Sequence, residues 1–494
     1  MNIIIGNLSK ASKLAFLSYG NQIISMALMF VEAKVLTNLL DISDYGAYNQ
    51  VLTTASLVTT VFSLNLGHGF IRFASGFPDE KKKETFHTVL LTQTLLYLFA
   101  FLLTLPVGLK ISEFLTDLKV IYPVFFIGLL AIISGGICNI QNFLLVSGQD
   151  VKMLLQNLYK TIIDVVFIIA AVLIIPSLFG ALFGYLLGEL FCFFFFSISN
   201  KIKYKGINVH IEILKELLRF SLPLMVTSIA YWIITSSNRY IINYYLGLES
   251  VGQFAIANRL PMMIVTIFTL LSTIFLSNTA RLFDSGNIKR TSYWFTQMIK
   301  VYILIGVSGS ALLVVAHRFI TLILSTPQYL FPDIAQFYIW LCVGSICFGL
   351  FQIISKIYDL EKKVKIISIF WGIILILNIL LNFIFIPPFG LLGSSWSSAI
   401  TFLTGLILAL VYRPKQIRFD FSWINITIYV VLSLLFSSFF TKEMLKHDFS
   451  IWVEAIFSLV SFFIVFIGGL FMKIISVEEL KELIYKKKNS SNGL

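Results

Sequence analysis

Long apolar stretches recur along the whole chain, and they decide which folds are open to it. Residues 120–146 and 391–411, for example, contain no lysine, arginine, aspartate or glutamate. A helix of about 20 apolar residues crosses the hydrocarbon core of a bilayer. These stretches are continuous, whereas the strands of a membrane barrel alternate apolar and polar residues. The sequence therefore predicts an all-α polytopic membrane protein.

The composition agrees with a membrane location. Hydrophobic residues make up 58% of the 494 residues and charged residues 13%, whereas about a quarter of the residues of a soluble protein are charged. We predict fourteen spans. The first is expected to remain as a helix, because no small-residue cleavage site follows it. The predicted spans are 14–39, 46–70, 86–109, 120–146, 153–175, 178–199, 217–246, 252–279, 293–316, 333–356, 365–386, 391–411, 423–440 and 451–472.

The distribution of lysine and arginine predicts the orientation of the chain. With the N-terminus in the cytoplasm, 27 of the 37 basic residues fall in cytoplasmic segments and 5 in outward segments. Basic residues concentrate on the cytoplasmic side of membrane proteins. Both termini are therefore predicted to be cytoplasmic. This orientation also accounts for the net charge of +12, so no nucleic acid partner is predicted.

An internal repeat is predicted from pairs of similar residues that keep their order along the chain, although short matches also arise by chance. Six spans separate the members of each pair, so the two halves have the same orientation, as in transporters built from two bundles around a central site. We predict an N-terminal six-helix lobe (1–208), a C-terminal six-helix lobe (209–414), and two additional helices with a basic cytoplasmic tail (415–494). The pairs are Lys34 with Arg239, Gly46 with Gly252, Arg72 with Arg281, Gly180 with Gly390, and Val151-Lys152 with Val364-Lys365.

Two segments resemble the signature motifs of one transporter family. The first is KVLTNLLDISDYGAYN, from Lys34, and the second is NRYIINYYLGLESVGQFAIANRL, from Asn238. They are similar to motifs of the bacterial polysaccharide-export flippases. These belong to the multidrug/oligosaccharidyl-lipid/polysaccharide (MOP) superfamily, which also contains lipid II flippases and drug exporters. The sequence departs from the family pattern at Asn38, where glycine is common, and at Asn238, where aspartate is common.

The resemblance implies a fold and a function, which we state as expectations. The fold would be a MATE-like pair of six-helix lobes around a central cavity with positive charge. The cargo would be an oligosaccharide linked to undecaprenyl pyrophosphate, moved by alternating access from the inner to the outer leaflet of the bacterial cytoplasmic membrane. The expected partners are this lipid-linked substrate, the membrane lipids, and the polysaccharide polymerase and glycosyltransferases of the same process.

Basic residues inside the spans are candidates for substrate binding. A charge at the centre of the bilayer costs at least about 2.5–3.5 kcal/mol, so it usually faces a cavity or a partner. Arginine binds phosphate through two parallel hydrogen bonds. Arg259, Asn258, Arg239 and Lys34 are therefore predicted to bind substrate, the alternative for each cation being a side chain that reaches the outer interface. Arg259 accompanies a polar stripe at helical spacing: Asn258, Thr266, Thr269, Thr273 and Ser277.

A second group of candidates lies near the cytoplasmic end of the second span. Asn65, His68 and Arg72 are spaced so that they share one face of a helix. Two of the three carry a positive charge or acquire one on protonation. We predict that His68 and Arg72 form an entrance for the pyrophosphate. The alternative is an ordinary positively charged end of a span.

Carboxylates inside the spans are candidates for ion coupling. Glu32 and Asp164 lie in predicted spans and are predicted to couple transport to H⁺ or Na⁺. A structural ion pair is the alternative, because Asp164 follows Lys160 by four residues and one helical turn brings them together. Glu189 is a weaker candidate for the same role.

The sequence contains no recognisable catalytic or cofactor motif. It has no G-x-x-x-x-G-K-[ST] phosphate loop and no cysteine and histidine spacing typical of a metal site. We predict no enzymatic activity, no cofactor and no bound metal. The alternative function is an ion-coupled drug or metabolite exporter of the same fold. A membrane glycosyltransferase or polymerase is disfavoured, because outward loops such as GLES at 247–250 are too short for a catalytic site.

Overall fold

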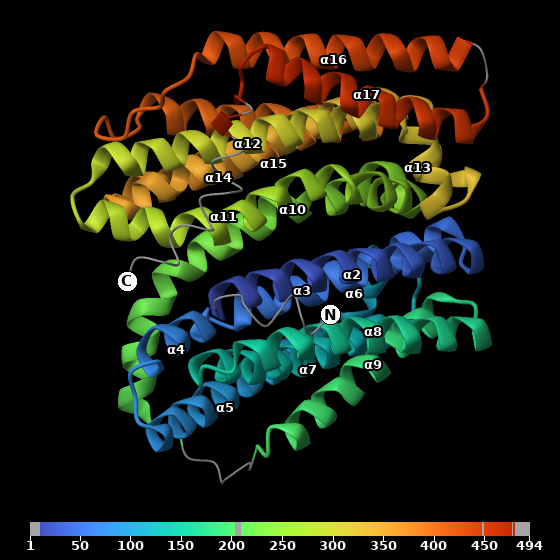
Figure 1. Cartoon of the computed structure of the whole chain (residues 1–494). Helices are drawn as coiled ribbons and strands as arrows, with labels where there is room; N and C mark the ends of the chain where they lie inside the picture. The colour runs from blue at the N-terminus through green and yellow to red at the C-terminus, as the bar shows by residue number, and fades with distance from the viewer. Residues whose placement is uncertain (1–9, 203–208, 447–448, 477, 480–494) are drawn as a thin grey trace, which may run out of the picture. The chain divides into compact units, whose positions relative to one another are not determined.

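The structure is a computed structural model that describes residues 10–202, 209–446, 449–476 and 478–479 (Figure 1). Every regular element in these ranges is a helix. Eleven helical stretches of the described chain are long and apolar enough to cross a membrane. The predicted all-α polytopic fold class is confirmed.

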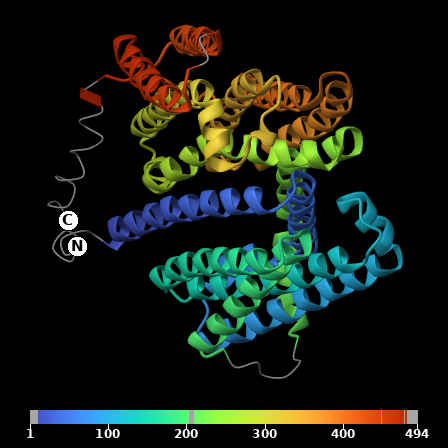
Figure 2. The same cartoon turned by 90° about the vertical axis from the view of Figure 1, so that its right-hand side faces the viewer.

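The helices form two compact units, and the N-terminal unit holds the cavity described below. This unit comprises the described residues up to Ile256, together with Leu324–Tyr329. Its helices α8 and α9 lie side by side, which Figure 2 shows from a second direction. The elements are α2 (Lys10–Leu39), α3 (Ile42–Phe62), α4 (Leu66–Ala74), α5 (Asp79–Thr104), η1 (Leu105–Val107), α6 (Gly108–Thr116), α7 (Tyr122–Val146), α8 (Asp150–Ile174), α9 (Leu178–Ser199) and all but the end of α10 (Ile211–Arg259).

The C-terminal unit comprises Ala257–Ile323 and the described residues from Leu330 onward. The predicted division into lobes at 1–208, 209–414 and 415–494 stays a prediction. Its elements are α11 (Pro261–Asp284), α12 (Ile288–Val315), α13 (His317–Leu324, except its last residue), α14 (Ile334–Leu360), α15 (Val364–Val411), α16 (Trp423–Lys446) and α17 (Ile451–Phe471). The short helix η2 (Pro327–Tyr329) belongs to the N-terminal unit.

Two of the long helices bend sharply at a glycine. The chain turns within α10 at Gly247 (φ 79°) and within α15 at Gly390 (φ 58°). Glycine adopts such positive φ values with little steric penalty. The loop predicted at 247–250 is therefore a kink at one residue, with helix on both sides. This difference explains why two predicted spans appear as one continuous element.

Gly46 and Gly252, which are paired in the predicted repeat, lie against each other where α3 meets the second half of α10. A Cβ atom on Gly46 would collide with the carbonyl oxygen of Leu248, and one on Gly252 would lie 2.6 Å from the carbonyl oxygen of Ile42. Each glycine thus faces the carbonyl group four residues before the other. This reciprocal contact supports the predicted repeat, because both pairs of positions are related by the same shift.

Three glycines of α9 allow it to pack closely against α8. Gly180, Gly184 and Gly188 recur every four residues, a spacing that predicts close contact between membrane helices. A Cβ atom on Gly184 would lie 2.6 Å from the carbonyl oxygen of Phe167, and one on Gly188 would lie 3.0 Å from the Cα atom of Asp164. The predicted packing role is confirmed, and it brings the polar residues of the two helices together.

A helix begins at the end of the described chain, and reciprocal hydrogen bonds stabilise its first turn. Ser476 and Glu479 bond reciprocally: the Ser476 N–H donates to Glu479 Oε2 (2.7 Å), and the Glu479 N–H donates to Ser476 Oγ (3.0 Å). This is a capping box. Burial acts to raise the pKa of Glu479, but hydrogen bonds from Ser476, Lys300 and Gln297 outweigh it, so that its pKa is lowered. The rest of the predicted basic tail lies outside the described residues.

Candidate functional site

The N-terminal unit contains a cavity of about 580 Å³, which we call the N-terminal cavity. It lies among α3, α4, α5, α7, α8, α9 and α10, and its volume is typical of sites for small molecules. The charged lining side chains are Lys160 and Glu189, and the imidazole of His68 also belongs to the lining. The lining amides and hydroxyls are those of Ser56, Thr59, Thr60, Ser63, Asn65, Gln93, Ser134, Asn139, Asn142 and Ser228, besides the rings of Tyr97 and Tyr185.

The helix is interrupted between α3 and α4, and this interruption forms part of the cavity wall. A single helix over 46–70 is predicted, and this is wrong: α3 ends at Phe62 and α4 begins at Leu66. Leu64 and Asn65 between them adopt positive φ values of 47° and 56°, a conformation that costs roughly 1–2 kcal/mol for a residue with a side chain. Broken helices at membrane depth occur where they are buried in protein or line a cavity, and Asn65 lines this one.

A chain of buried amides holds this break in place. Gln93 Nε2 donates to the carbonyl oxygen of Ser63 at 2.7 Å, and Asn139 Nδ2 donates to Gln93 Oε1 at 2.7 Å. Both amide side chains are buried. Neither Gln93 nor Asn139 was predicted as a site residue, although polar residues inside apolar spans are a recognised signal of contacts between helices.

The predicted entrance residues all lie on the α4 side of the break, but not all of them line the cavity. His68 lies on α4 and lines the cavity together with Asn65. Arg72 lies one turn further along α4, is exposed, and is not part of the lining. The structure thus brings two of the three residues to the cavity, and the role predicted for His68 and Arg72 in substrate entry stays a prediction.

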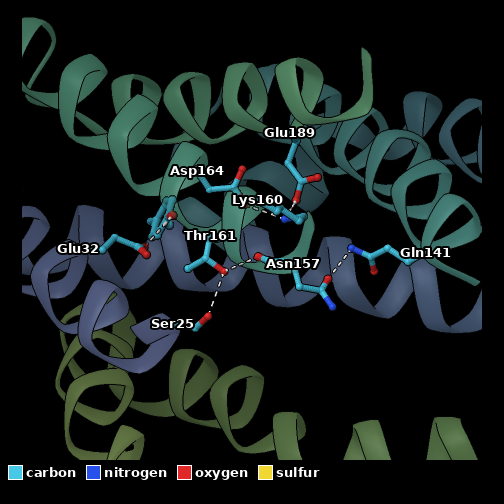
Figure 3. Close-up of polar contacts among 9 residues, drawn as sticks. Ser25, Glu32, Gln141, Asn157, Lys160, Thr161, Asp164 and Glu189 are labelled. Carbon is cyan, nitrogen blue, oxygen red and sulfur yellow. Dashed lines mark hydrogen bonds and ion pairs between the residues drawn. The ribbon is translucent and has the colours of Figure 1, made fainter. Parts of the chain in front are cut away.

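Lys160, Asp164 and Glu189 form an ion-pair cluster beside the cavity (Figure 3). Lys160 Nζ lies 2.7 Å from Asp164 Oδ2 and 2.6 Å from Glu189 Oε1. Asp164 belongs to α8 like Lys160, and Glu189 comes from α9. The predicted pairing of Lys160 with Asp164 is present. The second partner, Glu189, was not predicted, because it lies on the next helix and only the close packing of α8 and α9 places it there.

The cluster has one ammonium group for two carboxylates. Glu189 is 1% exposed, and its Oε2 atom has no hydrogen-bond partner among the described residues; the same holds for Asp164 Oδ1. A buried polar atom without a partner costs about 1–3 kcal/mol. Such atoms therefore mark a place where a bound molecule or a proton would be stabilised.

A second set of contacts joins α2 and α7 to α8 around this cluster (Figure 3). Glu32 accepts a hydrogen bond from the Tyr48 hydroxyl at 3.3 Å, and it is close enough to Asp164 for their charges to interact. The two carboxylates proposed for ion coupling are thus neighbours, and their role in coupling stays a prediction. The other contacts are Ser25 with Thr161 (3.4 Å) and Gln141 with Asn157 (2.6 Å).

Lys34 and Arg239 are not part of the lining of the N-terminal cavity. Lys34 Nζ donates to the carbonyl oxygen of Ser325 at 2.7 Å, and Thr37 Oγ1 donates to that of Leu324 at 3.2 Å. The end of α2 thereby holds the segment Leu324–Tyr329. The carbonyl oxygen of Arg239 accepts a hydrogen bond from Gln50 Nε2 at 3.2 Å. Substrate binding by Lys34 and Arg239 stays a prediction.

Arg259 and Asn258 are the last two residues of α10 and belong to the C-terminal unit. Asn258 is buried and Arg259 is half-buried. The next helix begins at Pro261, which lacks the N–H that would continue the hydrogen-bond ladder. The stripe predicted on one helix is therefore divided, with Asn258 on α10 and Thr266 on α11. Its other side chains, Thr269, Thr273 and Ser277, lie outside the described residues.

The sequence of the chain matches two known families. Residues 12–276, more than half of the chain, match the family described as Polysaccharide biosynthesis protein. Residues 223–384 match the MatE family. No curated protein sequence matches the chain.

Solved structures with the same fold are transporters. Lipid II flippase MurJ, in an inward closed conformation, has a TM-score of 0.69 and 16% identity, covering 96% of this chain and 99% of that chain. An inward-facing multidrug resistance MATE family transporter of the MOP superfamily has a TM-score of 0.65 and 14% identity, covering 81% and 97%. A MOP superfamily transporter from Pyrococcus furiosus, described by the reverse polarity of its binding pocket, has a TM-score of 0.59 and 15% identity, covering 82% and 95%. The chain therefore belongs to the polysaccharide biosynthesis protein family and is a multi-pass membrane protein with the fold of the MOP superfamily transporters.

Proposed function

We propose that this protein is a flippase that moves an oligosaccharide linked to undecaprenyl pyrophosphate from the inner to the outer leaflet of the bacterial cytoplasmic membrane. The observation that carries the proposal is the N-terminal cavity, which lies among membrane helices of a polysaccharide biosynthesis family member. Its amides and hydroxyls both donate and accept hydrogen bonds. Sugars, which carry a hydroxyl on almost every carbon, are suited to such a lining.

The physical problem that such a protein solves is the desolvation of the sugar head. A hydroxyl group moved into hydrocarbon without a hydrogen-bond partner costs several kcal/mol, roughly 4–8 against cyclohexane. An oligosaccharide carries many of these groups, so it does not cross a bilayer unaided. A cavity that carries amides and hydroxyls among its apolar side chains supplies partners to the head while the polyprenyl chain stays in the lipid, and alternating access then releases the head on the other side.

The pyrophosphate needs a separate set of contacts, since it carries negative charge. We propose that basic residues outside the N-terminal cavity provide them, in agreement with the affinity of arginine for phosphate. Both termini would be cytoplasmic, and the polymerase and glycosyltransferases of surface polysaccharide synthesis would be functional partners. The proposed pyrophosphate contacts outside the cavity are Arg259, Arg239, Lys34 and Asn258, with Arg72 at the entrance. His68, which lines the cavity, is proposed as a further entrance residue.

The test is reconstitution of the purified protein in liposomes that hold an undecaprenyl-pyrophosphate-linked oligosaccharide in the inner leaflet. A lectin added outside measures how much sugar has reached the outer leaflet. We expect the protein to speed this exposure, and the Arg259→Ala variant to lose most of the gain. Arg219→Ala is the control, because Arg219 is an exposed arginine of the same helix. Exposure no faster than in protein-free liposomes contradicts the proposal.

A second candidate function is export of organic cations, and one observation favours it. The two buried carboxylates around Lys160 are groups that attract a cationic drug, and one solved structure with this fold is of a multidrug resistance transporter. The same liposomes, loaded with a fluorescent organic cation instead of the glycolipid, separate the two functions. Transport of the cation without exposure of sugar would favour the exporter.

A further inference from the structure

The charges that line the N-terminal cavity differ from those that a pyrophosphate site needs. None of the four basic residues predicted to bind phosphate from within the spans or at the entrance, Arg259, Arg239, Lys34 and Arg72, belongs to the lining. The lining ammonium, that of Lys160, lies between two carboxylates at 2.6 and 2.7 Å. The cluster therefore offers no positive surplus to an anion.

The cavity does offer an acceptor for a hydrogen-bond donor. Glu189 lines the cavity, its side chain is 1% exposed, and Oε2 has no partner among the described residues. A donor on a bound molecule, either a hydroxyl, an amide N–H or an ammonium group, would satisfy this buried atom once the carboxylate turns toward the cavity. A carboxylate on the bound molecule would instead face Glu189 with a like charge, which is strongly unfavourable at low dielectric.

The rest of the lining combines apolar side chains, such as Leu52 and Ile71, with amides and hydroxyls, and this mixture fits an uncharged ligand such as a sugar. The amide of Asn142 and the hydroxyl of Ser134 supply donors and acceptors, and the Ser228 hydroxyl, which donates to the carbonyl oxygen of Leu224 at 3.3 Å, supplies an acceptor. The ring of Tyr185 lies beside Lys160, with Nζ at 5.7 Å from the ring centroid, and it contributes an aromatic face to the lining. The broken backbone at Asn65 adds a strained segment, and strain of this kind is concentrated at binding sites.

We propose that the N-terminal cavity is a sugar subsite that accepts neutral and amino sugars and excludes acidic ones, and that Glu189 determines this specificity. The proposal rests on the proposed flippase function and adds the class of sugar to it. The pyrophosphate binds elsewhere, so the subsite contacts the sugar unit alone. A uronic acid meets the Glu189 carboxylate, whereas the N–H of an acetamido group or the ammonium of an amino sugar pairs with it.

The test compares three ligands that share undecaprenyl pyrophosphate and differ in the sugar: N-acetylglucosamine, glucosamine and glucuronic acid. Isothermal titration of the purified full chain in detergent, at one salt concentration and pH 7, gives the Kd of each. We expect the acidic ligand to bind more than about tenfold more weakly than the other two, because like charges brought together at a binding site cost several kcal/mol. In Glu189→Gln this ratio should fall several-fold, since the side chain keeps its shape and loses its charge.

Two further variants keep the result interpretable. Glu454→Gln removes another buried carboxylate, which pairs with Arg318 in the C-terminal unit, and should leave the ratio unchanged. Asn142→Ala removes a lining amide and should weaken all three ligands by a similar factor. Equal Kd values for the three ligands, or an unchanged ratio in Glu189→Gln, overturn the specificity proposal while the flippase function stands. If none of the three ligands binds, the flippase function itself is overturned.

Discussion

At the scale of single residues, Lys160 is the side chain on which the buried charge of the N-terminal unit depends. Replacing it with methionine leaves Asp164 and Glu189 together without their cation, and loss of one partner from a buried ion pair typically costs about 3–5 kcal/mol. We therefore expect Lys160→Met to lower the free energy of unfolding by about this amount. Thermal unfolding of the purified protein in detergent measures the change.

The chain offers a matched control for this prediction. Lys82 pairs with Asp79 at 3.4 Å, and the aspartate side chain is 88% exposed. Exposed pairs contribute about 0–1 kcal/mol, so Lys82→Met should unfold at nearly the wild-type temperature. Combining Lys160→Met with Glu189→Gln should recover part of the loss, because the double variant has one buried charge fewer. Equal effects of the two lysine substitutions would show that the cluster is not buried as described.

Some contacts between the polar residues of the site could be predicted from the sequence, and others could not. Lys160 and Asp164 are four residues apart on one helix, so their pairing follows from helical geometry. Glu189 joins them across a separation of 29 residues, and Asn139 meets Gln93 across 46. Such contacts depend on how helices pack, and helical periodicity within one span carries no information about the neighbouring helix.

At the scale of elements, the crossing of α3 and α10 depends on the absence of side chains at Gly46 and Gly252. A Cβ atom at either position meets a backbone carbonyl group, which cannot move aside as a side chain can. We expect Gly46→Ala and Gly252→Ala each to lower the free energy of unfolding by about 1–3 kcal/mol, the usual range for overpacking. The two effects should be similar, because the contact is reciprocal. Thermal unfolding again measures them.

Gly372→Ala is the control for this pair. Gly372 lies within α15, and a Cβ atom there would have nothing within 4 Å. Alanine has a higher helix propensity than glycine by about 1 kcal/mol, so this substitution should be neutral or stabilising. If Gly46→Ala proves as stable as Gly372→Ala, the helices do not cross at these glycines.

The helices themselves were predictable from the apolar runs, but their interruptions only in part. Gly247 and Gly390 stand at the two kinks, and glycine is a recognised signal for a change of direction. The break at Leu64 and Asn65 carries no such signal, since leucine rarely adopts a positive φ. It exists because surrounding residues such as Gln93 stabilise it, and those contacts are not local in sequence.

At the scale of the whole molecule, the order of the two motifs along the chain was enough to predict the family and the fold. The position of the cavity was not predictable in the same way. Intramembrane cations suggested a positively charged site, whereas the N-terminal cavity is lined by apolar side chains, amides, hydroxyls and a cluster in which one ammonium group faces two carboxylates. A cavity forms where several helices do not fill the space between them. Its position depends on the packing of all these helices, so no local sequence motif predicts it.

The same cluster bears on what drives transport. A sodium ion needs several oxygen ligands at once, and the Lys160 ammonium already pairs with one oxygen of each carboxylate, at 2.6 Å for Glu189 and 2.7 Å for Asp164. A proton needs no vacant position, because it binds directly to an oxygen atom such as Asp164 Oδ1, which has no hydrogen-bond partner among the described residues. We therefore expect transport to be coupled to protons and not to sodium, and the liposome assay with imposed gradients measures this.

An inward-directed proton gradient should accelerate exposure of the sugar, and nigericin should abolish the gain. A sodium gradient of the same size should have no effect. Asp164→Asn removes the proton acceptor while Lys160 keeps Glu189 as its partner, so this variant should expose sugar at a rate that no longer responds to the proton gradient. Acceleration by sodium in the wild-type protein would mean that Lys160 leaves the carboxylates during transport, and the assignment of protons as the driving ion would be wrong.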